Sequence, residues 1–135
     1  MPITYQLEPS LGAEDFRGIL IASTLAERRP AEDLARLEIM VRQADVLVTA
    51  RDGGRLVGVS RAITDFAYCC YLSDLAVDPA YQRQGIGRRL IEETHRAAGA
   101  ETTTLVLVAA PTAENYYPKI GLKHVPSCWA IPRAR

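Results

Sequence analysis

The segment of residues 75–91 constrains the fold most, because two closely spaced glycines join a strand-like run to a helix-like run. The apolar run ends at Asp78 and Pro79, and proline cannot donate a ladder hydrogen bond, so a strand should stop there. Gly85 and Gly87 then open a stretch with helical apolar spacing. Glycines let a backbone approach a ligand, and the free N–H groups of a helix start favour an anion. The segment therefore predicts a strand, a tight loop and a helix start suited to a pyrophosphate.

The rest of the chain alternates between strand-period and helix-period segments, without a repeat or a linker. Strand–helix–strand units require parallel pairing and hairpins require antiparallel pairing, so the order predicts an α/β fold with a mixed sheet. We expect six to seven strands flanked by about four helices, in a single domain covering residues 1–135. The expected strands are residues 3–8, 46–49, 55–63, 67–77, 102–109, 122–125 and 128–131. The first expected helix ends near residue 30, and the other expected helices are residues 30–41, 85–98 and 113–120.

The balance of charge excludes some classes of partner. The chain has 16 basic and 16 acidic side chains, whereas proteins that bind nucleic acids usually carry a basic excess. Its apolar runs are much shorter than the roughly 20 residues that cross a bilayer, and its first residues do not resemble a signal peptide. The three cysteines have no metal-ligand spacing. We therefore expect no nucleic-acid partner, no membrane, no metal and a cytoplasmic location.

The glycine loop fits one nucleotide-binding pattern better than others. A Rossmann fingerprint needs a third glycine where Leu90 stands, and a Walker loop needs Gly-Lys-Ser/Thr, which is absent. Gln82 precedes the two glycines, which gives the pattern Gln-x-x-Gly-x-Gly. Arg83 and Arg88 add positive charge beside the loop, although the overall charge of the chain is zero.

With these residues the chain resembles the GNAT superfamily of N-acetyltransferases, whose acetyl-CoA motif is Gln/Arg-x-x-Gly-x-Gly/Ala between a strand and a helix. Residues 113–122, Ala-Glu-Asn-Tyr-Tyr-Pro-Lys-Ile-Gly-Leu, look like that family's Ala-x-x-Phe-Tyr-x-Lys-x-Gly-Phe signature. The resemblance covers about residues 45–125. It implies acetyl-CoA as the cosubstrate, an amine as the acceptor, and a V-shaped opening between strands that end near Val77 and Ala109. It also allows a homodimer.

The resemblance implies roles for residues of both motifs. The strand end would hold the pantetheine arm, the loop amides would hold the pyrophosphate, Tyr117 would protonate the leaving thiolate, and Tyr116 would only pack. Departures from the family pattern include Ala110 where an asparagine is common, Pro118 where many members carry a glutamate, and Leu122 in place of a phenylalanine. The implied cofactor-binding residues are Leu75, Ala76, Val77, Gln82, Arg83, Gln84, Gly85, Ile86, Gly87 and Arg88.

The reaction also needs a base and an acceptor pocket. An amine attacks a thioester only as the free base, and a lysine-like amine with a pKa of about 10.4 is mostly protonated at neutral pH. Asp74 is the candidate base, although it could instead bond to loop backbone, and Tyr68 and Tyr71 could line the acceptor pocket or simply pack. Two alternatives stay open: a CoA-binding regulatory or catalytically vestigial module, and a non-enzymatic interaction domain.

Overall fold

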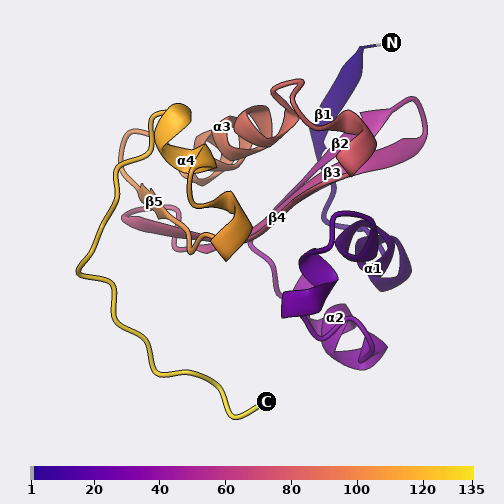
Figure 1. Cartoon of the computed structure of the whole chain (residues 1–135), viewed down its shortest axis with the longest axis horizontal. Coiled ribbons are helices and arrows are strands. Elements are labelled where there is room, and N and C mark those ends of the chain that lie inside the picture. The colour runs from indigo at the N-terminus through magenta and orange to yellow at the C-terminus, as the bar shows by residue number, and fades with distance from the viewer. Residues whose placement is uncertain (1) are drawn as a thin grey trace.

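The computed structural model describes residues 2–135, and its centre is one mixed sheet of five strands in the order β1-β2-β3-β4-β5 (Figure 1). Neighbouring strands are antiparallel from β1 to β4, whereas β4 and β5 are parallel. The mixed sheet agrees with the fold class expected from the sequence. The strands are β1 (Ile3–Leu7), β2 (Val46–Asp52), β3 (Arg55–Thr64), β4 (Cys69–Val77) and β5 (Thr104–Val106).

Helices cover both faces of the sheet and give the molecule two apolar cores (Figure 1). One face packs against α1 (Ala13–Ala22) and α2 (Leu34–Arg42), and the other packs against α3 (Ile86–Ala98). A short helix, α4 (Tyr116–Lys119), follows β5. Three single turns of 3-10 helix complete the elements: η1 (Leu25–Arg28), η2 (Pro79–Tyr81) and η3 (Pro111–Ala113).

The apolar spacing of each long helix accounts for the face that it buries. Phe16, Ile19 and Leu20 lie on one side of α1 and are buried in the first core. Full burial of each such side chain contributes about 2 kcal/mol. On the opposite face of the sheet, a Cβ at Gly58 would lie 3.1 Å from the Cδ1 atom of Leu90. A glycine at this point of β3 therefore lets α3 rest closely on the sheet.

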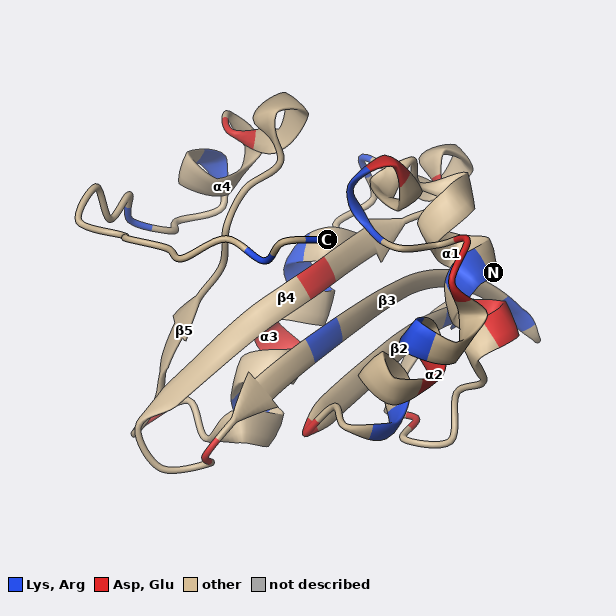
Figure 2. Cartoon of the chain, turned by 90° about the horizontal axis from the view of Figure 1, so that it is seen from below, with Lys and Arg blue, Asp and Glu red and all other residues tan. Residues whose placement is uncertain are grey.

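A β-bulge in β4 changes which face its side chains occupy. Arg61 is the register partner of Asp74 and the next residue of β3 is the partner of Leu72, so Ser73 is an extra residue in the ladder. Cys70 packs in the α3 core, whereas Ala76 packs in the core beneath α1 and α2. Figure 2 shows β3 and β4 side by side, with a basic residue of β3 next to an acidic residue of β4 in the middle of the sheet.

The sequence-based expectation of six to seven strands is wrong, because residues 122–125 and 128–131 form no strand. Pro126 and Pro132 interrupt and end this segment, and prolines cannot donate to a ladder. The only tie that we see in the last residues is Arg36, whose Nη2 donates to the carbonyl of Arg135 at 2.8 Å. Residues 123–135, the C-terminal tail, are all exposed, and Trp129 among them is 91% exposed.

Two further boundaries differ from the sequence analysis. The first helix divides into α1 and η1 because Thr24, with φ of 68°, lies in the left-handed region and cannot continue the helix. β5 is shorter than the expected strand of residues 102–109. Across residues 2–135, no helix combines the length and the apolar character that a membrane span needs.

Candidate active site

The sheet opens between β4 and β5, as the sequence analysis predicted, but the opening begins earlier than expected. The two strands pair only from Cys69 and Thr104 to Tyr71 and Val106, and β4 then continues to Val77 without β5 beside it. The same end of β4 still pairs with β3 on its other side. One edge of residues 72–77 is therefore free to bond an extended ligand through backbone N–H and C=O groups.

The three strand residues predicted to hold a ligand arm all lie on this free stretch. Ala76 is buried, whereas Leu75 and Val77 are half-buried. The side chain of Gln82 reaches back and donates from Nε2 to the carbonyl of Val77 at 3.3 Å. Gln82 therefore ties the loop to the end of β4, and this gives a physical reason for a glutamine at that position.

The loop between β4 and α3 presents its backbone to solvent. Arg83 and Gly85 both have positive φ, 65° and 79°, and residues 82–85 are exposed. Such a conformation is strained for Arg83, which is not a glycine, and backbone strain of this kind clusters at functional sites. The Asp78 carboxylate holds the loop start by accepting from the N–H of Ala80 at 2.9 Å.

The first turn of α3 leaves several backbone donors free. The N–H of Arg89 donates to the carbonyl of Gly85 at 3.0 Å, so the N–H groups of Ile86, Gly87 and Arg88 have no partner within the helix. These donors and the positive end of the helix dipole favour an anion. Gln84 is exposed in the loop, and Ile86 anchors the helix start in the core.

Charged side chains surround the loop. Arg88 is exposed and pairs with Glu92 at 3.2 Å, one helical turn further along. Arg89 instead stacks over the ring of Tyr5, with 4.8 Å between its Cζ atom and the ring centroid. Arg83 in the loop and Arg88 at the helix start are therefore the exposed cations beside the free amides, whereas Arg89 is held against Tyr5 of β1.

The tyrosines of α4 form an edge-to-face pair. Their ring centroids are 5.3 Å apart, with 72° between the planes. Burial raises the pKa of Tyr117, and the neighbouring Tyr116 acts in the same direction. Tyr117 therefore stays protonated at neutral pH, as a general acid must. Gly121, with φ of 96°, ends the helix, and the carbonyl of Tyr117 accepts from the N–H of Leu122 at 3.1 Å.

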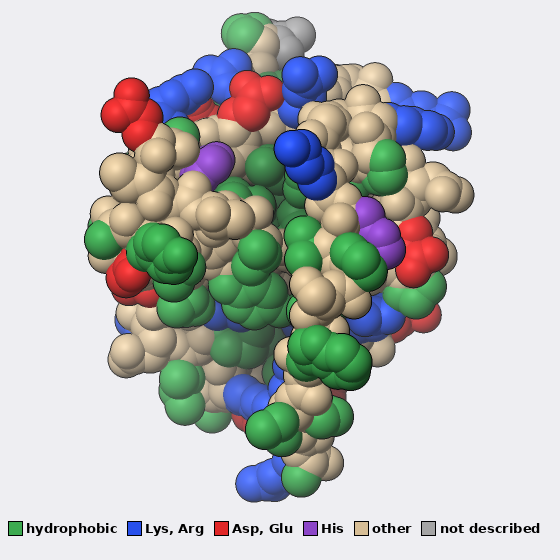
Figure 3. Space-filling model, turned by 90° about the vertical axis from the view of Figure 1, so that its left-hand side faces the viewer, with side chains coloured by type: hydrophobic (Ala, Val, Ile, Leu, Met, Phe, Trp, Pro, Cys, Tyr) green, Lys and Arg blue, Asp and Glu red, His purple; other side chains and the backbone are tan. Residues whose placement is uncertain are grey.

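Tyr68 and Tyr71 occupy different parts of the opening. Tyr71 is 42% exposed and lies where β4 and β5 separate. Tyr68 is 79% exposed and lies at the closed end, where its carbonyl accepts from the N–H of Thr104 at 3.0 Å. The face with β5, α4 and the tail is hollowed, and hydrophobic side chains gather along it (Figure 3). The structure brings Tyr71 to the opening but keeps Tyr68 at its far end.

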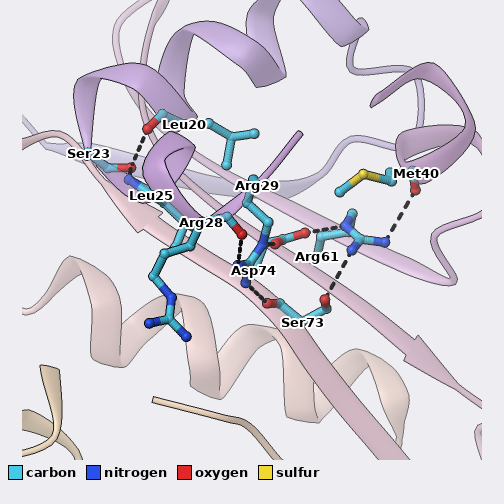
Figure 4. Close-up of polar contacts among 9 residues, drawn as sticks. All are labelled: Leu20, Ser23, Leu25, Arg28, Arg29, Met40, Arg61, Ser73 and Asp74. Carbon is cyan, nitrogen blue, oxygen red and sulfur yellow. Dashed lines mark hydrogen bonds and ion pairs between the residues drawn. The ribbon is translucent and has the colours of Figure 1, made fainter. Parts of the chain in front are cut away.

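Asp74 lies between two arginines that the sequence analysis did not consider (Figure 4). Its side chain is fully buried, its Oδ1 accepts from Nε of Arg29, and its Oδ2 accepts from Nε of Arg61. Arg29 also donates to the carbonyl of Ser73 at 2.7 Å, and Arg61 donates to the Ser73 hydroxyl at 3.1 Å.

This cluster argues against Asp74 as the general base. Both carboxylate oxygens already accept from guanidinium groups, so neither is open to a substrate amine. The cluster instead ties the segment after η1 to β3 and β4. A signal for Arg61 was present in the sequence, because a charge inside an otherwise apolar strand requires a buried partner. Arg29 gave no such signal, because it lies in a mixed-charge loop.

Within residues 2–135, no three His, Cys, Asp or Glu side chains come together so that they could hold a metal ion.

Comparison with protein families gives a match over most of the chain. A family model described as acetyltransferase (GNAT) domain matches residues 13–127. The chain is also similar to "Histone acetyltransferase TAP1" of Glycine max, at 34% identity over 73 residues, and to "GCN5-related N-acetyltransferase 2, chloroplastic" of Arabidopsis thaliana, at 33% over 73 residues. These stretches cover 53% of the chain but only 32% and 28% of the two relatives. The chain thus spans about a third of their length.

Solved structures agree with the fold over nearly the whole chain. A GNAT-family acetyltransferase from Streptococcus pneumoniae has a TM-score of 0.78 at 25% identity, covering 99% of this chain and 98% of its own. A probable acetyltransferase from Staphylococcus aureus has a TM-score of 0.81 at 21% identity, covering 99% and 100%. The aminoglycoside N-acetyltransferase AAC(6′)-Iy, in complex with CoA, has a TM-score of 0.76 at 17% identity, covering 99% and 96%. The last two likenesses concern the fold alone.

Proposed function

Because the chain belongs to the GNAT family of acetyltransferases, we propose that it transfers an acetyl group from acetyl-CoA to a primary amine. One observation carries the proposal: the free edge of β4 leads directly to a loop and a helix start with unpartnered N–H groups. An extended arm followed by a pyrophosphate needs these two features in this order. AAC(6′)-Iy, a protein of the same fold, was solved in complex with CoA, which supports this choice of donor.

The residues present fit acetyl-CoA as a bound donor. The backbone of Leu75, Ala76 and Val77 would bond the pantetheine arm, and the amides of residues 83–88 would bond the pyrophosphate. Gly85 fits this role because the loop adopts a positive φ there. The exposed guanidinium of Arg88 lies next to these amides and would add charge-assisted bonds to phosphate oxygens.

Transfer would proceed by direct attack in a ternary complex. The amine nitrogen forms a bond to the thioester carbonyl carbon, the carbon–sulfur bond breaks, and the nitrogen loses a proton. Tyr117, held protonated by burial, would supply the proton to the leaving thiolate. A free backbone N–H of β4 would stabilise the oxyanion. Because Asp74 is engaged by two arginines, the amine proton would leave through water.

The acceptor class stays broad. Tyr71, exposed where the strands separate, remains the better-placed candidate to touch the acceptor, and Tyr68 is the weaker one. The cytoplasmic location and the homodimer stay predictions.

A thiol-release assay tests the proposal. The protein would be mixed with acetyl-CoA and a panel of polyamines, aminoglycosides, amino acids, arylalkylamines and lysine peptides, and free CoA thiol would be measured. We expect release that depends on both the protein and one class of amine. A protein that binds CoA but releases no thiol with any amine would favour the alternative of a vestigial CoA-binding module, to which the engaged state of Asp74 lends some support.

A further inference from the structure

Tyr116 places a hydroxyl at the start of α3, where the family signature has a phenylalanine. A Cβ at Gly87 would lie 2.8 Å from the Tyr116 hydroxyl oxygen and 3.6 Å from the ring carbon that bears it. The expectation that Tyr116 only packs is therefore incomplete: its ring packs on Gly87, but its polar atom reaches the turn that carries the free amides. The same contact explains why position 87 has no side chain.

The surroundings of this hydroxyl orient it as an acceptor toward the protein. Burial raises the pKa of Tyr116, while the backbone N–H of Arg88 and the guanidinium of the same residue act in the opposite direction. The backbone N–H of Arg88 is directed at the phenol oxygen, so the O–H points away from that N–H. Among the hydrogen bonds within residues 2–135 we find none in which the Tyr116 hydroxyl donates, and the residue is 36% exposed. The O–H is thus available to an anion beside the helix start.

We infer that Tyr116 is a ligand for the pyrophosphate of the donor. Its hydroxyl would donate to a phosphate oxygen next to the amides of Ile86 and Gly87. This inference rests on the proposed function, because it assumes that the loop holds acetyl-CoA. It adds a side-chain donor from α4 to a site otherwise built from the backbone of the loop and α3 and from the guanidinium of Arg88.

Calorimetric titration with CoA and with pantetheine, which lacks the pyrophosphate, tests this role. A hydrogen bond to a charged group contributes enough to change affinity about tenfold. We therefore expect Tyr116→Phe to weaken CoA binding about tenfold and to leave pantetheine binding unchanged. Tyr117→Phe is the matched control, because it removes the same atom from the adjacent residue and should leave CoA affinity near that of the wild type. Thermal unfolding of each variant would verify that it is folded.

Three outcomes would overturn the inference, and they point to different errors. Unchanged or tighter CoA binding by Tyr116→Phe would show that the hydroxyl is not a ligand, or that it blocks the site. An equal loss for CoA and pantetheine would place Tyr116 against the arm instead of the phosphates. If the wild-type protein does not bind CoA, the proposed function itself fails, whatever the variants do.

Discussion

The buried carboxylate of Asp74 faces two guanidinium groups, so its energetic role differs from that of a surface charge. Removing one partner from a buried ion pair costs about 3–5 kcal/mol, because it leaves the other charge desolvated and unpaired. Arg61 is almost fully buried and Arg29 partly so, and each also bonds to Ser73. At the scale of single residues, this cluster is the strongest polar tie between the segment after η1 and the sheet.

We expect Asp74→Asn to lower the free energy of unfolding by about 3 kcal/mol, because a neutral amide cannot balance two guanidinium groups. Urea denaturation at neutral pH measures the change. Glu38→Gln is the control: Glu38 pairs with Arg42 at 2.8 Å on an exposed face and should shift stability by less than about 0.5 kcal/mol. Unchanged stability of Asp74→Asn would contradict the structural role and return the residue to the list of candidate bases.

Tyr117→Phe should lower kcat about 100-fold while leaving the affinity for acetyl-CoA near that of the wild type, because only proton transfer to the thiolate is lost. Steady-state kinetics and calorimetry check the two halves of this prediction. The pKa of Tyr117 is raised, so activity that depends on the protonated phenol should persist through neutral pH and fall only in the alkaline range. An unchanged kcat would remove Tyr117 from the acid role.

The residues of the site divide into those that the sequence could predict and those that it could not. Gln82, Gly85 and Gly87 have a fixed spacing along one loop, so a local pattern was sufficient to find them. The contact of Arg29 with Asp74 joins residues 45 positions apart, and only the folded chain brings them together. Backbone geometry also decides the role of Asp74, because the bulge at Ser73 turns its side chain toward α1 and α2.

At the scale of elements, the opening between β4 and β5 depends on a short parallel pairing beside a long antiparallel one. β4 keeps its partner β3 to its end, whereas its pairing with β5 stops at Tyr71 and Val106. The sequence predicted this opening through the family resemblance. It did not predict the loss of the last two strands, because alternating apolar residues indicate a strand only when a neighbouring edge is available to pair with them.

Gly85→Val should abolish detectable CoA binding, because a β-branched residue cannot adopt the φ of 79° that the loop requires. Calorimetry measures the loss. Gly53→Val is a matched control: Gly53 also has a positive φ, 60°, and open space around it, but it lies in the turn between β2 and β3. It should lose some stability and retain CoA binding. Retained binding by Gly85→Val would mean that the loop is misassigned.

Glu8, which directly follows β1, binds residues of β2 through its carboxylate. We expect the ionisation of this carboxylate to contribute to the free energy of unfolding at acid pH. Glu8 accepts from Arg51 at 2.7 Å and from the Thr49 hydroxyl at 2.9 Å, and chiefly the bond from Arg51 lowers the pKa of Glu8 from 4.5 to about 2. A carboxylate whose pKa is lower in the folded protein than in the unfolded chain stabilises the fold. This stabilisation is fully present at a pH above the pKa of the unfolded chain and is lost as the pH falls through the pKa of the folded protein.

Glu8→Gln should therefore lower the free energy of unfolding by about 2 kcal/mol at neutral pH. The difference from the wild type should shrink between about pH 4.5 and pH 2 and vanish below that range. Denaturant titrations across this range measure the difference. Glu14→Gln serves as the control, because Glu14 pairs with Arg17 on the exposed surface of α1. A difference that is independent of pH would contradict the assignment of the lowered pKa.

At the scale of the whole molecule, a net charge of zero coexists with a local site for an anion. Within residues 2–135, nine of the 16 basic side chains pair with acidic ones, as in the pairs of Arg51 with Glu8 and Arg42 with Glu38. The loop before α3 adds backbone donors that no count of charges reveals. Composition could therefore argue against a nucleic-acid surface but not against a nucleotide-bearing donor, and the acceptor depends on the three-dimensional shape of the opening.

A labelled acetyl group would show directly whether the protein transfers it from acetyl-CoA to an amine. The wild-type protein would be incubated with acetyl-CoA carrying an isotopically labelled acetyl group and with the amine that gives most thiol release, and mass spectrometry would analyse the amine and the protein. Direct transfer predicts the label on the amine, none on the protein, and greatly reduced product with Gly85→Val. No labelled amine with any acceptor, or a labelled protein that passes the acetyl group on, would contradict the account.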